Sequence, residues 1–165
     1  MTTTEIMELS DYELRAFLAR NHTGRIAYSL HGDIEIQPIS YSYDNGWIMG
    51  RTSVGTKLSA LSQNPWCAFE VDEVSNPFEW ISVVARGAFH LLDPEWGSPD
   101  VYARALASVG AMIPDAFSPE DPVPHRNILF GICVSEMTGR RARRHARAVA
   151  TPALGTPALG TPALL

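Results

Sequence analysis

The sequence has few of the residues from which metal sites and disulfide frameworks are built. Of its 165 residues only Cys67 and Cys133 are cysteines, and both stand among apolar residues without a C-x-x-C spacing. The five histidines are scattered, with neither an H-x-H nor an H-E-x-x-H motif. We therefore expect two buried, reduced thiols and no structural metal site.

Long hydrophobic runs are also missing. No apolar stretch approaches the roughly 20 residues that a membrane helix needs. The opening residues MTTTEIMELS have neither the basic start nor the apolar core of a signal peptide. With 45% hydrophobic and 19% charged residues, the composition is ordinary for a globular protein. These features predict a cytoplasmic protein with one domain, whose core is large enough to fold without disulfides.

Acidic residues outnumber basic ones, and the two signs are unevenly distributed. The net charge is -5, but five arginines lie between residues 140 and 147 and no acid follows Gly139, so residues 1–139 carry -10. The basic segment GRRARRHAR, residues 139–147, has the charge to bind nucleic acid or an acidic membrane. No aromatic residues interleave its arginines, so nucleic acid is not the expected partner. We expect a basic helix that covers the acidic body.

The order of the predicted elements favours a mainly β protein with peripheral helices. Ser10 and Glu13 form a capping box before a short helix that should end near Asn21. Strand patterns follow, several joined by short turns such as DNG at 44–46. The expected strands are 24–30, 33–43, 47–52, 66–72, 79–92 and 127–137, and further helices are expected over 56–63 and 93–113. Six strands joined mostly by tight turns predict an antiparallel barrel.

The end of the chain differs from the rest. TPALGTPALGTPALL is a five-residue repeat with a proline in each copy, a composition typical of linkers and flexible ends. We therefore assign the folded domain to residues 1–148 and a flexible repeat tail to residues 149–165.

The stretch GRTSVGTKL, residues 50–58, has the composition of an anion site. It approaches the P-loop pattern G-x-x-x-x-G-K-[ST], but the last two residues of the pattern are transposed. The strands before it are joined by tight turns and are therefore predicted to be antiparallel, whereas a nucleotide-binding loop needs a parallel βαβ unit. Lys57 is the only lysine of the chain and stands where a short helix would open with free amide groups. Arg51 adds charge, and Thr52 and Thr56 add hydroxyls. These residues alone fit either a phosphate site or an ordinary turn with a surface cation.

Five motifs occur in order along the chain: GRIAYSLHGDIEIQPISY, IMGRTSVGTKL, NPWCAFEVD, EWISVVARGAFHLLD and VSEMTGRRA. Together they resemble the FMN-binding split-barrel family, the pyridoxamine 5'-phosphate oxidase-like superfamily, in its nitroimidazole-reductase-like branch. The resemblance covers roughly residues 8–145. It implies a homodimer of six-stranded antiparallel split β-barrels with FMN held at the interface.

The resemblance also implies which residues bind the cofactor. The FMN phosphate would be bound by Arg51, Thr52, Thr56 and Lys57. The edge of the isoalloxazine would be lined by Pro38, Ile39, Ser40 and Tyr41. Trp80 and Ser82 would approach the flavin and could come from the partner subunit. Gly139 and Arg140 resemble the glycine-arginine pair that ends the last strand of the family.

Two departures from the family pattern narrow what the resemblance implies. Gly50 stands where nitroimidazole-reductase-like members often carry a histidine, which argues against their drug-reducing chemistry. The chain also lacks the basic substrate-binding ending of the pyridoxamine oxidase itself, since TGRRARRHAR runs into the proline repeats.

Several aromatic and acidic residues have more than one interpretation. Trp80 could be a core or interface tryptophan, and Tyr41 could be either a packed aromatic or a proton donor near the flavin. Glu70 and Asp72 face the same side of their strand; they could form an acid pair, but we expect a solvated face or a salt bridge to Arg86. No general base or nucleophile stands out, which suits a protein whose cofactor performs the redox chemistry.

Two functions are compatible with these features. The favoured one is a flavin-dependent oxidoreductase in which FMN passes electrons from NAD(P)H to a small acceptor. The alternative is a non-catalytic split barrel that binds flavin, haem or a deazaflavin. The sequence does not name the acceptor.

Overall fold

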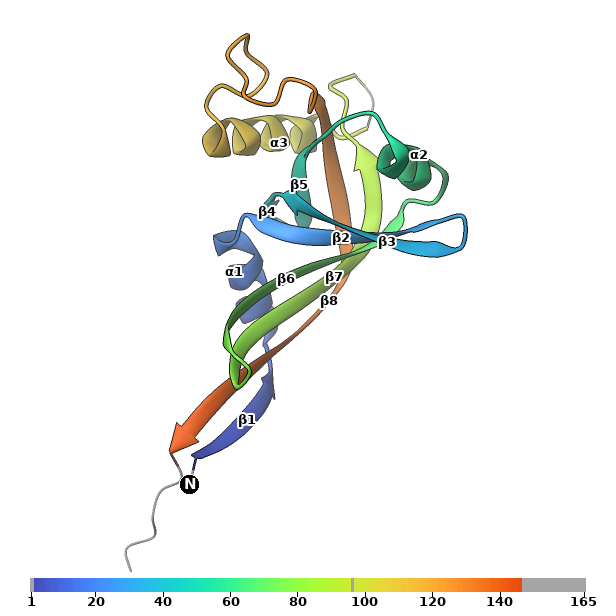
Figure 1. Cartoon of the computed structure of the whole chain (residues 1–165). Helices are drawn as coiled ribbons and strands as arrows, with labels where there is room; N and C mark the ends of the chain where they lie inside the picture. The colour runs from blue at the N-terminus through green and yellow to red at the C-terminus, as the bar shows by residue number, and fades with distance from the viewer. Residues whose placement is uncertain (1, 96, 147–165) are drawn as a thin grey trace, which may run out of the picture.

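The structure is a computed structural model that describes residues 2–95 and 97–146. The elements in this part of the chain (Figure 1) are β1 Thr2–Glu8, α1 Asp11–Arg20, β2 Thr23–Leu30, β3 Asp33–Ser40, β4 Ser42–Asp44, β5 Trp47–Thr52, α2 Thr56–Gln63, β6 Trp66–Asn76, β7 Glu79–Leu91, α3 Pro99–Met112 and β8 Ile128–Ala146. The predicted repeat tail and the last two residues of the predicted domain lie outside the described residues. Within them, no helix is long and apolar enough to cross a membrane.

All eight strands belong to one antiparallel sheet that closes on itself. The order is β3-β2-β6-β7-β8-β5-β4, and β1 pairs with the end of β8. The outermost strands, β3 and β4, are separated in the chain by Tyr41 alone, so the sheet must curl until they meet. The predicted mainly β split barrel with peripheral helices is confirmed. Two strands were not predicted: 33–43 divides into β3 and β4, and the N-terminal residues form β1.

The helices lie where the sequence patterns place them. α1 begins with the predicted capping box, because the hydroxyl of Ser10 accepts the amide hydrogen of Glu13 at 3.4 Å and the Glu13 carboxylate accepts that of Ser10 at 2.9 Å. It ends at Arg20, as expected. α2 matches the predicted helix 56–63. α3 begins at Pro99, later than predicted, because proline suits the first turn of a helix, where no amide donor is needed.

Two hydrophobic clusters stabilise the barrel and its helices. The larger fills the barrel and includes the fully buried Tyr41, Phe69 and Phe130, against which α1 packs Leu18. The second lies between α3 and the sheet and consists of Met49, Val101, Ala105, Val109 and Leu129. α3 is therefore fixed to the outer surface of β5 and β8, close to the segment predicted to bind phosphate.

The prediction of a basic helix after Gly139 is wrong. β8 continues to Ala146, between β1 and the start of β7, and these strands extend away from the barrel (Figure 1). Along this extension Ala142 is buried, Arg143 and Arg144 are exposed, and Arg141 forms an ion pair with Glu13 at 3.0 Å. The segment 140–146 has only two apolar residues, Ala142 and Ala146, and they do not alternate with the paired arginines, so the sequence alone shows no strand pattern.

Of the two thiols expected to be buried, one is buried and the other is exposed. Cys67 is buried, its Sγ lies 3.6 Å from the carbonyl oxygen of Gly87, and burial raises the pKa of its thiol to about 12. Cys133 is exposed. Successive side chains of a strand point to opposite faces, and Ile132 points into the core, so its neighbour Cys133 points outward.

The acidic pair Glu70 and Asp72 has a different partner from the one expected. Arg25, opposite Glu70 on β2, places Nη1 3.0 Å from the Glu70 carboxylate and within hydrogen-bonding distance of Asp72. Arg86 instead lies opposite Ala68 and faces Glu136 on β8, at 3.8 Å. The register of β6 and β7 displaces Arg86 by two residues from Glu70, which explains why they do not pair.

Candidate functional site

At the predicted phosphate segment, Lys57 carries a positive charge that no acidic side chain in the described part of the chain neutralises. This segment joins β5 to α2 (Figure 1), and Lys57 stands half-buried in the first turn of the helix. No side chain caps the amides that open α2. Burial, and then the charge of Arg126, lower the pKa of Lys57. No ion pair involves Lys57 among the described residues. An anion placed here would restore the favourable environment that the charged lysine lacks.

Arg51, also predicted to bind the phosphate, is already neutralised by a carboxylate. Its guanidinium makes a two-pronged ion pair with Asp121, with Nη2 3.0 Å from Oδ1, and the two side chains are only 5% and 3% exposed. Asp121 also accepts the amide hydrogens of Phe117 and Val123, at 2.8 and 2.9 Å. The hydrogen bonds from Arg51 are the main reason that the pKa of Asp121 lies well below its usual range. The ion pair therefore leaves Arg51 little charge to offer a ligand.

The two threonines of the segment differ in accessibility. Thr52 is buried at the end of β5, opposite Ile128. Thr56 is exposed and lines a cavity of about 480 Å³. The other residues around this cavity are Ser29, Leu30, His31, Gly55, Ser59, Ala60, Gln63 and Asn64. Of the four residues predicted to bind phosphate, Thr56 and Lys57 are thus accessible to a ligand, whereas Arg51 and Thr52 are buried.

The four residues predicted to line the isoalloxazine alternate in direction at the end of β3. Ile39 and Tyr41 point into the core, and the hydroxyl of Tyr41 donates to the carbonyl oxygen of Leu18 at 2.9 Å. Burial raises the pKa of this phenol, and the packed-aromatic interpretation describes its side chain. Pro38 and Ser40 are exposed on the outer face of the sheet. Of the four predicted residues, only Pro38 and Ser40 present their side chains at that face.

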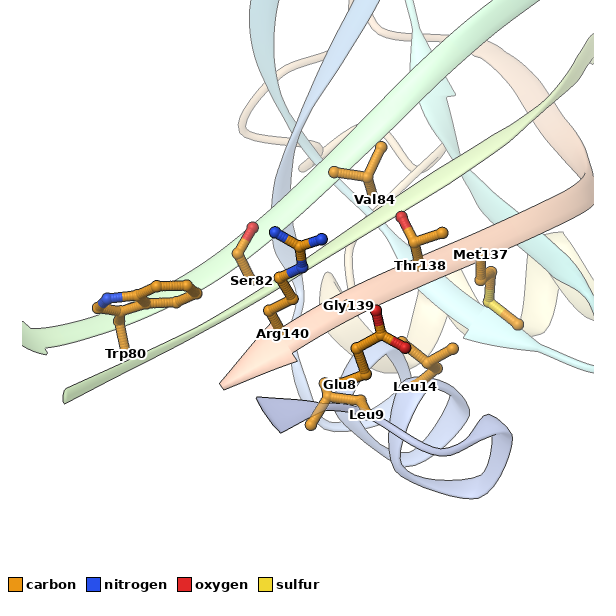
Figure 2. A pocket seen from close by; sticks show the side chains of 10 residues that line it. All are labelled: Glu8, Leu9, Leu14, Trp80, Ser82, Val84, Met137, Thr138, Gly139 and Arg140. Atoms are coloured by element: carbon orange, nitrogen blue, oxygen red, sulfur yellow. The ribbon is translucent and has the colours of Figure 1, made fainter. Parts of the chain in front are cut away.

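A second cavity lies where β7 leaves the barrel. It has a volume of about 470 Å³, and its lining residues are Glu8, Leu9, Leu14, Trp80, Ser82, Val84, Met137, Thr138, Gly139 and Arg140. Figure 2 shows Trp80, Ser82 and Arg140 on adjacent strands, and Ser82 is the register partner of Arg140. In the described residues Arg140 forms no ion pair. The cavity combines an aromatic ring, a cation and hydroxyls, and it includes both predicted flavin contacts of β7.

The phosphate segment and the second cavity lie toward opposite ends of β7 in one protomer. The amide of Phe89 on β7 donates to the carbonyl oxygen of Pro65, just after α2, at 2.8 Å. Trp80 lies at the other end of the same strand. At about 3.3 Å per residue the strand from Phe89 to Trp80 is at most about 30 Å long, and the irregularity between Arg86 and Gly87 shortens the straight distance.

The packing around Gly50 explains why this chain has no histidine at that position. A Cβ atom at Gly50 would lie 2.7 Å from the carbonyl oxygen of Ser40 and 2.9 Å from the ring of Phe130. Backbone and a fully buried ring cannot move aside easily. The close approach of β3 and β5 that closes the barrel therefore excludes any side chain here.

Fold and cavities together define an antiparallel split-barrel protein with cavities on its outer surface. A family model described as pyridoxamine 5'-phosphate oxidase matches residues 10–141, and the chain belongs to this family. The resemblance found in the sequence is thereby confirmed. Comparison with curated proteins finds no match.

Solved structures with the same fold come from several bacteria. A FAD-binding protein from Mesorhizobium loti is 25% identical, with a TM-score of 0.69, over 86% of this chain and 99% of its own. A protein from Bacteroides thetaiotaomicron proposed to act in 5-nitroimidazole antibiotic resistance is 18% identical, with a TM-score of 0.63, over 86% and 91%. A heme-binding protein from Mycobacterium smegmatis is 17% identical, with a TM-score of 0.61, over 75% and 50%.

Proposed function

We propose that the protein binds FMN and is a flavin-dependent oxidoreductase that passes electrons from NAD(P)H to a small acceptor. The observation that carries this proposal is Lys57, a half-buried cation at an uncapped helix opening with no acid paired to it in the described part of the chain. Such a site suits a phosphate group. The FAD-binding protein from Mesorhizobium loti supports a flavin as the ligand.

The accessible residues of the phosphate segment and of the second cavity have separate roles in this proposal. Lys57 binds the phosphate through its ammonium group, and Thr56 donates its hydroxyl hydrogen. Bound FMN supplies the two-electron redox chemistry, which the side chains do not. Trp80 would shield the ring system from water, and Arg140 and Ser82 would hold its polar edge, since all three line the second cavity.

The proposed assembly is a homodimer in which each flavin is bound by both subunits. The two halves of the site lie toward opposite ends of β7, up to about 30 Å apart along the strand, so the partner would supply Trp80 and Ser82. The outer face of the sheet also carries large exposed apolar side chains: Ile34 (76% exposed), Ile36 (62%), Trp66 (63%) and Val74 (63%). They share this face with Pro38 and Ser82. A second copy would bury this surface.

The first test is the absorbance spectrum of the purified protein. We expect a yellow protein that releases FMN, identified by mass, at about one per subunit, and that bleaches when NADH or NADPH is added without oxygen. A colourless or haem-red protein, or a yellow one that neither nicotinamide reduces, would favour the non-catalytic alternative. The fold shared with the heme-binding protein makes that alternative worth testing. Released FAD or deazaflavin would refute FMN as the cofactor.

The second test concerns the dimer. Light scattering should give a mass near twice 18.1 kDa. Ile36→Glu places a charge in the proposed interface and should produce monomers with reduced flavin content, because half of each site is then missing. Tyr12→Glu adds the same charge on α1, where Tyr12 is 81% exposed, and should remain dimeric. A wild-type monomer that binds FMN tightly would contradict the shared site.

A further inference from the structure

The loop between α3 and β8 is organised around one buried carboxylate. Asp121 accepts hydrogen bonds from the backbone amides of Phe117 and Val123. It also accepts hydrogen bonds from both terminal nitrogens of the Arg51 guanidinium. Phe117 has a left-handed backbone conformation, with φ of 65°, which is unfavourable for a large side chain without such support. Asp121 therefore gives this proline-rich loop a defined shape.

The same network fixes the position of Arg126. Its amide donates to the carbonyl oxygen of Val123 at 3.0 Å, and its own carbonyl oxygen accepts from Nη1 of Arg51 at 3.4 Å. Two residues later β8 begins, where Ile128 pairs with Thr52 at the end of β5. The chain at Arg126 thus lies beside the start of the phosphate segment, although the two are far apart in the sequence.

Lys57 and Arg126 are two cations of this region that no carboxylate of the described residues neutralises through an ion pair. The backbone of Arg126 is held beside Arg51, at the start of the phosphate segment, and the charge of Arg126 contributes to the lowered pKa of Lys57. Within residues 2–95 and 97–146 neither forms an ion pair. Two cations that repel each other at a surface bind an anion more strongly than either would alone, because the anion removes the repulsion as well as adding two attractions.

We propose that Arg126 is a second cationic ligand of the flavin phosphate beside Lys57, and that the buried Arg51–Asp121 pair positions it. This inference rests on the proposed FMN site and changes its composition: Arg51 supports the site from inside, and Arg126 replaces it as the arginine at the ligand. The recognised chemistry is a phosphate monoester, to which a guanidinium can donate two parallel hydrogen bonds.

The test measures dissociation constants of FMN and riboflavin for the flavin-free protein. Arg126→Gln should weaken FMN about 3- to 10-fold, less than a fully buried contact would, because Arg126 is exposed. Riboflavin has no phosphate, and its binding should be unchanged. Arg126→Lys should restore most of the FMN affinity. The ratio of the two constants separates a phosphate contact from a general effect on the loop, which would change both ligands alike.

Arg15→Gln is the matched control. Arg15 is an exposed arginine on α1 whose partners are Asp11 and Tyr43. Its replacement therefore removes one positive charge from a different part of the surface. Its FMN constant should equal that of the wild type. If Arg126→Gln leaves the ratio unchanged while Lys57→Ala changes it, the role of Arg126 is refuted and the FMN site stands. If the wild type itself binds FMN and riboflavin equally, the phosphate site and this inference both fail.

Discussion

Replacing Lys57 with alanine should weaken FMN binding about 10- to 150-fold and leave riboflavin binding nearly unchanged. The lost interaction joins an ammonium group to a phosphate of almost two negative charges, at a half-buried position. Charge-assisted contacts of this kind contribute about 1.5–3 kcal/mol, and each 1.4 kcal/mol is a factor of ten in affinity. Fluorescence titration of the flavin-free variant with each ligand measures both constants.

Two further measurements show whether the effect is local. Lys57→Arg should keep much of the FMN affinity but not all, because a planar fork replaces a compact charge. The melting temperature of Lys57→Ala without flavin should be equal to or slightly above that of the wild type, since burial and Arg126 both oppose the charged lysine. Equal loss of FMN and riboflavin affinity, or no loss of either, would make Lys57 an ordinary surface cation.

Elements with local signals in the sequence were predictable. The capping box of α1, the helix 56–63 and the DNG turn each depend on residues that are neighbours in the chain. The basic extension of β8 depends instead on pairing with β1, more than 130 residues earlier in the chain. Its arginines are kept in a strand by this backbone ladder and by the ion pair between Arg141 and Glu13. A pattern search within the segment finds none of these partners.

The composition of the proposed site was predictable only where its residues are contiguous in the chain. The segment 50–58 could be recognised as a candidate anion site because its glycines, hydroxyls and charges lie within nine residues. The burial of Arg51 could not, since Asp121 stands 70 residues away in a loop without regular structure. Arg126 was missed for the same reason: no local motif surrounds it, and only the folded loop brings it near Lys57.

The buried pair of Arg51 and Asp121 predicts a large loss of stability when one partner is removed. Arg51→Met fills similar space but leaves the Asp121 carboxylate buried without its cation, and breaking such a pair is far costlier than breaking an exposed one. We expect the melting temperature at pH 7 to fall by roughly 6–20 °C. Arg20→Met is the control: it breaks an exposed pair with Glu73, at 2.8 Å and about half exposed on each side, and should cost less than about 4 °C.

The pH dependence identifies the carboxylate as the cause. Because the pKa of Asp121 is lowered in the folded protein, its stabilising effect is complete above the unfolded value of about 3.9 and is lost as pH falls below it. The wild type should therefore lose stability between about pH 4 and pH 2. Arg51→Met should lose less over this range, because without Arg51 the charged form of Asp121 no longer stabilises the folded protein. If both proteins lose stability equally in acid, or if Arg51→Met melts like Arg20→Met, the pair does not hold the loop. In the expected case the variant should also bind FMN more weakly, since the loop that carries Arg126 is no longer fixed beside Lys57.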